Sequence, residues 1–219
     1  MEIRWFGQSF FEITTDTDVK KGAKAYIDPY DSSIGLTPPS DLQADLVMVS
    51  HQHPDHNNVK AFADPGIVIE GSGEYSVSGI DVKGILTYHD TKLGSELGVN
   101  IIYLLESEGI RLAHFGDLGH PLSESQIRDI DGVDILMIPV GGKYSLSSND
   151  AVKTIKQIEP KIVIPMHYKI PGIKVELLDL EGFCKEMGIC ATEPVPKLSV
   201  KKINLEGKEM EVVILQVQK

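Results

Sequence analysis

The chain has 219 residues, of which 42% are hydrophobic, and a formal net charge of −11. This length predicts a single domain over residues 1–219 with an ample core. No apolar run approaches the roughly 20 residues needed to cross a bilayer, and the Lys and Arg residues are scattered rather than gathered into a basic face. We therefore expect neither a membrane nor a nucleic acid as a partner.

The N-terminal residues and the two cysteines are features that indicate the cellular location. Residues 1–5 lack the basic and apolar regions of a signal peptide, so a cytoplasmic location is the expectation. Cys184 and Cys190 are too few for a disulfide framework and lie away from the histidine-rich segment, so we interpret them as ordinary thiols. A homo-oligomer is an open alternative.

The first half of the chain is typical of β structure. A hairpin is predicted over residues 2–14, then a short strand at 25–27, an irregular proline-containing loop at 29–44 and a buried strand at 46–49. Residues 57–64 have the composition of a short helix that ends at Pro65-Gly66. Further strand-like runs follow, several with alternating apolar residues, at 67–70, 74–77, 80–87, 99–106 and 110–115.

The second half alternates strands with helices. Two helices are predicted, one from the caps at 147–150 to about Gln157 and one near 177–188. The predicted strands of this half are 135–140, 161–164, 198–203 and 210–217.

The strongest motif follows the strand at 46–49. His51, His53, Asp55 and His56 fall within six residues, and Pro54 prevents a regular continuation of the strand. Such closely spaced imidazoles and a carboxylate are costly to bury unpaired, whereas a divalent cation would compensate them. Neutral imidazole with carboxylate suits zinc, iron or manganese. The motif therefore predicts a metal site on a loop.

Three more candidate ligands each follow a predicted strand. His89 follows the run at 80–87, Asp117 follows 110–115 and His167 follows 161–164. Loops at the ends of strands along one edge of a sheet share a rigid frame, so these side chains are expected to meet the first motif.

This set of motifs resembles the metallo-β-lactamase-fold superfamily, whose later ligands occur in the same order: a lone His, a Gly-Asp and a final His. The resemblance implies an α+β fold, a four-layer αββα sandwich of two sheets packed face to face with helices outside. The mixture of antiparallel runs and strand–helix alternation agrees with it.

The resemblance also implies a dinuclear centre. One metal would be held by His51, His53 and His89, the other by Asp55, His56 and His167, and Asp117 would bridge them. The ions are expected to be zinc, with manganese, iron and nickel as alternatives. A hydroxide shared between them is the expected nucleophile, Asp117 and Asp55 are the catalytic carboxylates, and Asp55 is a candidate proton acceptor.

The expected function is a metal-dependent hydrolase of lactonase or phosphodiesterase type that acts on a small-molecule ester, lactone or phosphodiester. Within the superfamily, the chain resembles compact Zn-dependent hydrolases similar to the ascorbate-6-phosphate lactonase-like group. The alternative is a non-hydrolytic metal-binding protein of the same fold with a redox, sensing or scaffolding role. The ligands alone do not separate lactone from phosphodiester chemistry.

Several other polar residues have open roles. Asp28 could orient a ligand imidazole or form a turn, and Lys143 or Tyr144 could contact an anionic substrate or belong to a plain loop. His114 is expected to be packed inside a strand. His120 could meet a substrate or donate a proton, although supporting the site or lying at the surface is the favoured expectation.

Overall fold

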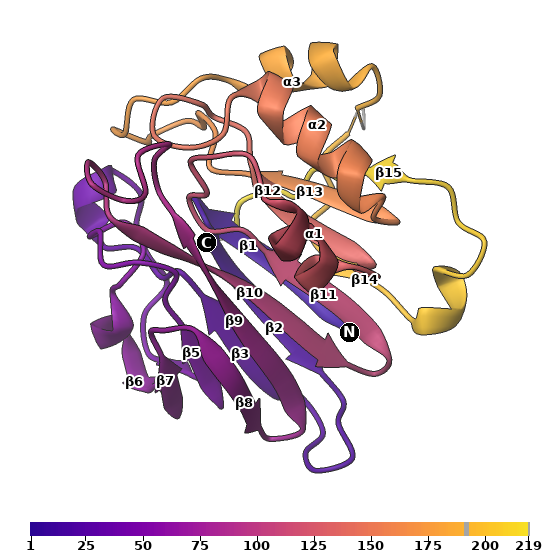
Figure 1. The fold of residues 1–219 in the computed structure, drawn as a ribbon. Coiled ribbons are helices and arrows are strands. Elements are labelled where there is room, and N and C mark those ends of the chain that lie inside the picture. Colours follow the sequence, from indigo (N-terminus) through magenta and orange to yellow (C-terminus); the bar gives the residue numbers. More distant parts are fainter. Residues whose placement is uncertain (191–192, 219) are drawn as a thin grey trace.

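The computed structural model describes residues 1–190 and 193–218, and within them two main sheets pack face to face (Figure 1). The first sheet is formed mostly by the N-terminal third of the chain. Its strands, in spatial order, are β14 (Leu198–Ser199), β1 (Glu2–Gly7), β2 (Phe10–Thr15), β3 (Ala23–Ile27), β5 (Leu46–Met48) and β7 (Ile67–Ile69).

The second sheet contains the remaining long strands and the two-residue strand β15 (Glu211–Val212). In spatial order they are β15, β13 (Ile162–Met166), β12 (Ile135–Pro139), β11 (Ile110–His114), β10 (Val99–Ser107), β9 (Ile80–Tyr88) and β8 (Gly73–Val77). Strands β8 to β11 pair antiparallel, whereas β11, β12, β13 and β15 pair parallel. A separate two-stranded pair joins β4 (Leu42–Gln43) to β6 (Phe62–Asp64).

The α-helices of the described residues, three in number, belong to the second half, where parallel strands require crossovers. Helices α1 (Glu124–Ile130) and α2 (Ser148–Ile158) connect β11 to β12 and β12 to β13, and α3 (Leu180–Met187) follows β13. Figure 1 shows them on the outer side of the second sheet. Short 3₁₀ helices occur at η1 (Ser32–Ile34), η2 (Val59–Ala61) and η3 (Lys202–Asn204).

Alternation along the strands separates two hydrophobic clusters. On β2, Phe11 and Ile13 belong to the large core that draws residues from both sheets, while Phe10 belongs to a second cluster with Tyr26 and Phe62. This second cluster also includes residues of η1 and packs against η2, so it covers the outer face of the first sheet. The αββα sandwich is therefore confirmed, with short 3₁₀ helices in the first outer layer. The shared core supports our proposal that residues 1–219 form one domain.

Three expectations need correction. The segment 57–64 forms η2 followed by the short strand β6 instead of one helix. The C-terminal runs 198–203 and 210–217 contain only the two-residue strands β14 and β15, with η3 starting at Lys202. Cys184 and Cys190 are not free thiols but form a disulfide, with their Cα atoms 5.3 Å apart.

The disulfide has a local cause that the cysteine count does not show. Helix α3 ends at Gly188, which adopts a left-handed conformation at φ +72° and donates its N–H to the Cys184 carbonyl. This helix-terminating turn reverses the chain and returns Cys190 to the last turn of the helix.

Helix α1 was not predicted, although its start carries a sequence signal. Ser123 accepts a hydrogen bond from the Gln126 backbone N–H, and the Gln126 side chain accepts one from the Ser123 backbone N–H. This reciprocal capping box follows the pattern Ser-x-x-Gln. In the part of the chain that the structure describes, no helix is both long enough and apolar enough to span a bilayer.

Candidate metal centre

Strand direction brings the candidate ligands together. Strands β9 and β11 both run antiparallel to β10, and β13 is parallel to β11 through β12, so all three end at the same edge of the second sheet. His89, Asp117 and His167 lie just past those three ends. His51 lies just past β5 of the first sheet, at the same end of the sandwich.

The Asp117 carboxylate lies at the centre of this cluster. Its Oδ2 atom lies 3.0 Å from His167 Nε2, 3.2 Å from His56 Nε2, 3.2 Å from His89 Nε2 and 3.9 Å from His51 Nε2. Four imidazole nitrogens from three separate loops therefore face one carboxylate oxygen.

The seven predicted residues fall into two groups of donor atoms. In each group the atoms lie within 4.8 Å of one another: His51, His53 and His89 in one, and Asp55, His56, Asp117 and His167 in the other. These are the two sets expected from the sequence, with Asp117 placed among the second. His53 and Asp55 are half-buried and the other five side chains are buried.

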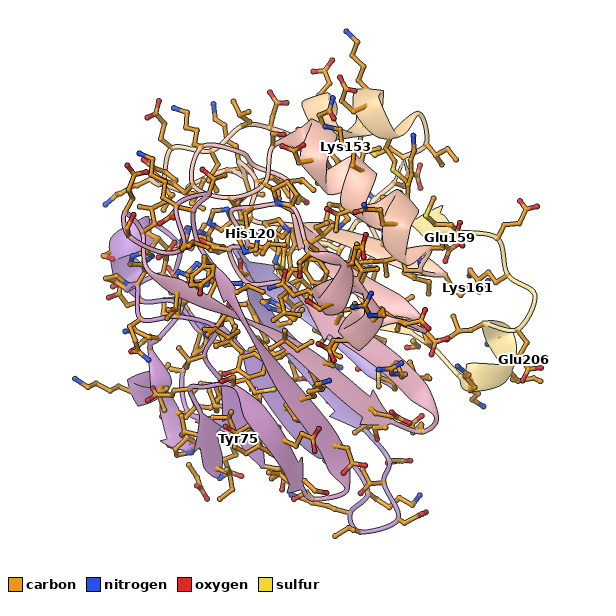
Figure 2. All side chains as sticks on the ribbon, viewed as in Figure 1. Tyr75, His120, Lys153, Glu159, Lys161 and Glu206 are labelled. Carbon is orange, nitrogen blue, oxygen red and sulfur yellow. A yellow bond between two sulfur atoms is a disulfide. The ribbon has the colours of Figure 1, made fainter. Side chains whose placement is uncertain are left out.

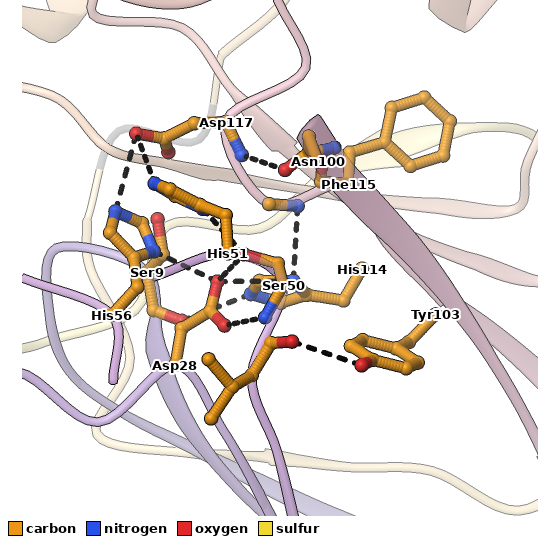
Figure 3. A network of polar contacts seen from close by, with 12 residues as sticks. Ser9, Asp28, Ser50, His51, His56, Asn100, Tyr103, His114, Phe115 and Asp117 are labelled. Carbon is orange, nitrogen blue, oxygen red and sulfur yellow. Dashed lines mark hydrogen bonds and ion pairs between the residues drawn. The ribbon is translucent and has the colours of Figure 1, made fainter. Parts of the chain in front are cut away.

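A buried hydrogen-bond network orients two of the imidazoles (Figure 3). Asp28 accepts bonds from the Ser50 backbone N–H at 2.7 Å and the Ser50 hydroxyl at 2.6 Å, and it pairs with His56 Nδ1 at 2.9 Å. Because the hydroxyl proton goes to Asp28, Ser50 Oγ accepts from His51 Nδ1 at 2.9 Å. We therefore assign the protons of both rings to Nδ1, which leaves Nε2 of His51 and His56 facing Asp117.

Asp28 thus has the orienting role considered from the sequence, and it also adopts a turn conformation at φ +53°. Its carboxylate is fully buried. Burial alone would raise the pKa of Asp28, but the His56 imidazole holds that pKa below its usual value. Partners of this kind fix the tautomer and orientation of metal-binding histidines.

Charges around Asp117 shift the pKa values in opposite directions. Burial and the neighbouring His56 lower the pKa of His51 to about 2, so this ring is neutral. Burial lowers the pKa of His56 as well, but the carboxylates of Asp117, Asp55 and Asp28 raise it well above its usual value. Burial raises the pKa of Asp117, yet the His167 and His56 imidazoles hold it well below its usual value. Asp117 is therefore ionised at neutral pH.

Several donor atoms of the cluster lack partners that a cation could supply. Among residues 1–190 and 193–218, His51 Nε2, His56 Nε2 and Asp117 Oδ1 are buried and make no hydrogen bond. Buried polar atoms without partners are rare and costly. Imidazole nitrogens and carboxylate oxygens are ligands of zinc and related divalent ions. The residues present therefore fit divalent metal ions.

Steric constraints explain why a glycine, Gly116, precedes Asp117. Asn100 Oδ1 accepts the Asp117 backbone N–H at 2.9 Å, and Asn100 Nδ2 donates to the Phe115 carbonyl at 3.0 Å. Gly116 lies between them at φ +53°, and a Cβ there would come within 2.3 Å of Asn100 Oδ1. Only glycine lets the asparagine hold Asp117 in place.

Gln8 is a site residue that the sequence analysis missed. Its Nε2 donates to Asp55 Oδ2 at 2.8 Å, and its backbone carbonyl accepts from the His167 N–H at 3.1 Å and the Trp5 indole at 2.9 Å. Gln8 is fully buried in the β1–β2 turn at φ +52°. It ties two candidate ligands to the hairpin, and nothing in its sequence position apart from the turn signals this.

The remaining histidines have structural partners. His114 is buried and its Nε2 bonds the Ser9 carbonyl at 2.9 Å, as expected for a packed strand residue. His120 Nε2 accepts from the Tyr88 N–H at 3.2 Å and its Nδ1 bonds the Pro121 carbonyl at 2.8 Å. Figure 2 shows His120 among the loops at this end of the sandwich. It supports the loop that carries His89.

A pocket of about 550 Å³ opens over the cluster. Its floor includes His53, Asp55, His89, Asp117 and His167. Tyr144 lines the pocket, whereas Lys143 forms an ion pair with Glu176. A pocket of this size is typical of small-molecule sites.

Comparisons with known proteins agree with this geometry. Residues 2–167 match the family model described as the beta-lactamase superfamily domain. A metal-dependent hydrolase of the UPF0173 group from Methanosphaera stadtmanae is 30% identical over 232 residues, covering 90% of this chain and 96% of that protein. A counterpart from Carboxydothermus hydrogenoformans is 27% identical over 218 residues, covering 86% and 94%.

Solved structures show the same relationship. A Thermotoga maritima protein described as a candidate Zn-dependent hydrolase of the metallo-beta-lactamase superfamily is 34% identical, with a TM-score of 0.79 over 99% of both chains. A metallo hydrolase from Ignicoccus hospitalis shares the fold at 19% identity, with a TM-score of 0.66 over 100% of this chain and 96% of that one. The two packed sheets carry the candidate ligands on loops at one end, and the family model and the solved structures match the chain. The chain therefore belongs to the beta-lactamase superfamily and has the metallo-β-lactamase fold.

Proposed function

We propose that this protein is a metal-dependent hydrolase with two metal ions. His51, His53 and His89 would hold one ion, Asp55, His56 and His167 would hold the other, and Asp117 would contact both. The observation that carries the proposal is the convergence of four imidazole Nε2 atoms within 3.0–3.9 Å of Asp117 Oδ2, and Asp117 itself lines the floor of a pocket. The relatives named as metal-dependent hydrolases support it.

When bound, the two ions would supply an activated water and draw electron density from the bond to be cleaved. The chain's own residues prepare that chemistry. Asp28 and Ser50 hold the His51 and His56 rings with Nε2 toward the site, and Gln8 restrains the Asp55 carboxylate. Because these contacts are formed within the fold, little reorganisation is needed at the moment of reaction.

Asp117 and Asp55 are the carboxylates that we place in the reaction itself. Both line the pocket, Asp55 as a half-buried side chain and Asp117 as a buried one at its floor. Burial raises the pKa of Asp55, but the neighbouring His56 holds it below its usual value. Asp55 is therefore ionised and free to accept a proton, although it is a weak base, and its main role is to hold a metal.

The proposed substrate is a small-molecule ester, lactone or phosphodiester, and the proposed ion is zinc, with manganese, iron and nickel as alternatives. The pocket volume supports a small molecule over a polymer. We also propose a cytoplasmic location, as expected from the sequence.

The test joins metal analysis to a hydrolysis screen. Protein purified without added chelator would be assayed for bound metals by mass spectrometry, then offered lactones, bis(4-nitrophenyl) phosphate and 4-nitrophenyl esters. We expect about two metal ions per chain and hydrolysis of at least one substrate class. Two bound ions with no hydrolysis of any class would favour the non-hydrolytic alternative. Absence of bound metal after reconstitution would contradict the proposal.

A further inference from the structure

The wall of the pocket above the cluster carries two charged side chains, Lys174 and Glu176. Their charges are not equally available. Glu176 forms an ion pair with Lys143, which lowers the pKa of Glu176 and offsets its charge. No ion pair joins Lys174 to any residue that the structure describes. Among the described residues of the pocket wall, Lys174 is therefore the cationic side chain whose charge is not offset by a carboxylate of the chain.

Lys174 is held in place by the first 3₁₀ helix. Its backbone N–H donates to the Ile34 carbonyl at 2.7 Å. Its aliphatic chain passes over Gly35, where an added Cβ would lie 2.8 Å from Lys174 Cγ. Gly35 adopts φ +92°, so glycine both ends η1 and leaves room for the lysine stem. The lysine is thus packed at its base while its ammonium group stays exposed.

Apolar side chains complete the wall. Ile34, Pro54, Leu97 and Val175 line the pocket between its charged parts. A ligand that fits would have a short apolar body, with one end over the ligand cluster and an anionic end near Lys174.

We propose that Lys174 recognises a carboxylate at the end of the substrate remote from the bond that is cleaved. The substrate class is then a small ester or lactone that carries a free carboxylate. A single uncompensated lysine matches a singly charged carboxylate better than a dianionic phosphate, which favours several donors. The assignment of an ester or lactone bond depends on the proposed function. The assignment of the anionic end depends only on the residues of the pocket wall.

The test compares two ligands of similar length that resist hydrolysis. The mono(4-nitroanilide) of glutaric acid carries a carboxylate, and hexanoic acid 4-nitroanilide is neutral. Binding of each to the metal-loaded protein would be measured by titration calorimetry in wild type, K174M, K174R and the control K185M, which removes an exposed lysine of α3. The corresponding 4-nitrophenyl esters would be assayed for hydrolysis in parallel.

We expect the wild type to bind the anionic ligand about 5–10-fold more tightly than the neutral one. K174M should lose this preference, whereas K174R and K185M should keep it. Equal binding of both ligands in wild type, or an unchanged preference in K174M, would overturn the proposal. A phosphonate analogue that binds more tightly than the carboxylate would overturn the carboxylate assignment.

The two proposals fail in different ways in this experiment. If the carboxylate preference depends on Lys174 but neither ester is hydrolysed, the result supports the anion site and contradicts the hydrolase proposal. If both esters are hydrolysed without a preference for the carboxylate, the result supports the hydrolase proposal and contradicts the anion site.

Discussion

The two donor groups lie side by side, yet they differ in charge. The group of His51, His53 and His89 has no carboxylate of its own, and burial lowers the pKa of both His51 and His53. The other group contains Asp55 and Asp117, whose charges raise the pKa of His56. His89 resembles His56, because burial lowers its pKa but contact with Asp117 raises it. Contact with Asp117 therefore favours an additional proton on His56 and His89 when no metal is present.

This difference suggests how each group would respond to a metal ion. Raised pKa values favour an additional proton on His56 and His89 that a metal would displace, whereas His51 and His53 are already neutral. The second group has the greater negative charge, so we infer that it binds the first ion more tightly.

The largest expected effect comes from removing the shared residue. Asp117→Ala should lower kcat/KM by at least about 10³-fold and weaken binding of both ions, because each group would lose its nearest carboxylate. Steady-state kinetics and metal analysis would check this. Asp81→Asn, which removes an exposed carboxylate from β9, is the control and should behave as wild type. Retained activity in the Asp117 variant would contradict the shared role.

The next effect separates the two groups. His53→Ala and His167→Ala should each reduce the metal content from about two ions to one, since each removes a donor from a different group. If the acidic group binds more tightly, the His53 variant should retain its remaining ion against a weak chelator better than the His167 variant. Loss of both ions from either variant would show that the groups do not bind independently.

A smaller effect is expected at Asp28. Asp28→Asn replaces one acceptor oxygen with an NH₂ donor, so it cannot serve both Ser50 and His56 as the carboxylate does. Zinc affinity should fall about 10–100-fold, measured by competition with a chromophoric chelator. Thermal unfolding of the metal-free variant would show whether the fold is kept. Unchanged zinc affinity in a folded variant would contradict the orienting role of Asp28 and leave it only a role in the turn.

The smallest effect is a pH dependence of zinc binding. A raised folded-state pKa means that charged His56 stabilises the metal-free protein at low pH and that this contribution is lost as pH rises through that pKa. Zinc must displace the proton, so affinity should rise with pH between 6 and 8, by up to about tenfold per unit for each proton released. Calorimetry in two buffers of different ionisation enthalpy would count the protons. No proton release at pH 7 would contradict the charge assigned to His56.

The seven donors could be predicted because each has a local sequence sign. His51, His53, Asp55 and His56 form one short motif, and His89, Asp117 and His167 each follow an apolar run that ends in a loop. Strand ends that share an edge bring such residues together whatever lies between them. The structure places all seven around one point, but their metal binding stays a proposal until ions are measured.

Other residues could not be predicted, because their roles depend on pairings distant in the chain. Gln8 reaches Asp55 because the β1–β2 turn lies beneath the loops that carry the candidate ligands. Lys174 meets the pocket through its bond to Ile34 and its packing over Gly35. The disulfide between Cys184 and Cys190 depends on the chain reversal at Gly188. None of these contacts follows from composition or periodicity.

The most direct test of the central claim is anomalous X-ray diffraction from crystals of the zinc-loaded protein, measured on both sides of the zinc absorption edge. The account predicts two anomalous peaks, one among His51, His53 and His89 and one among Asp55, His56 and His167, with the Asp117 carboxylate between them. A single peak elsewhere, or no peak with His89 and His167 turned away from Asp117, would contradict it.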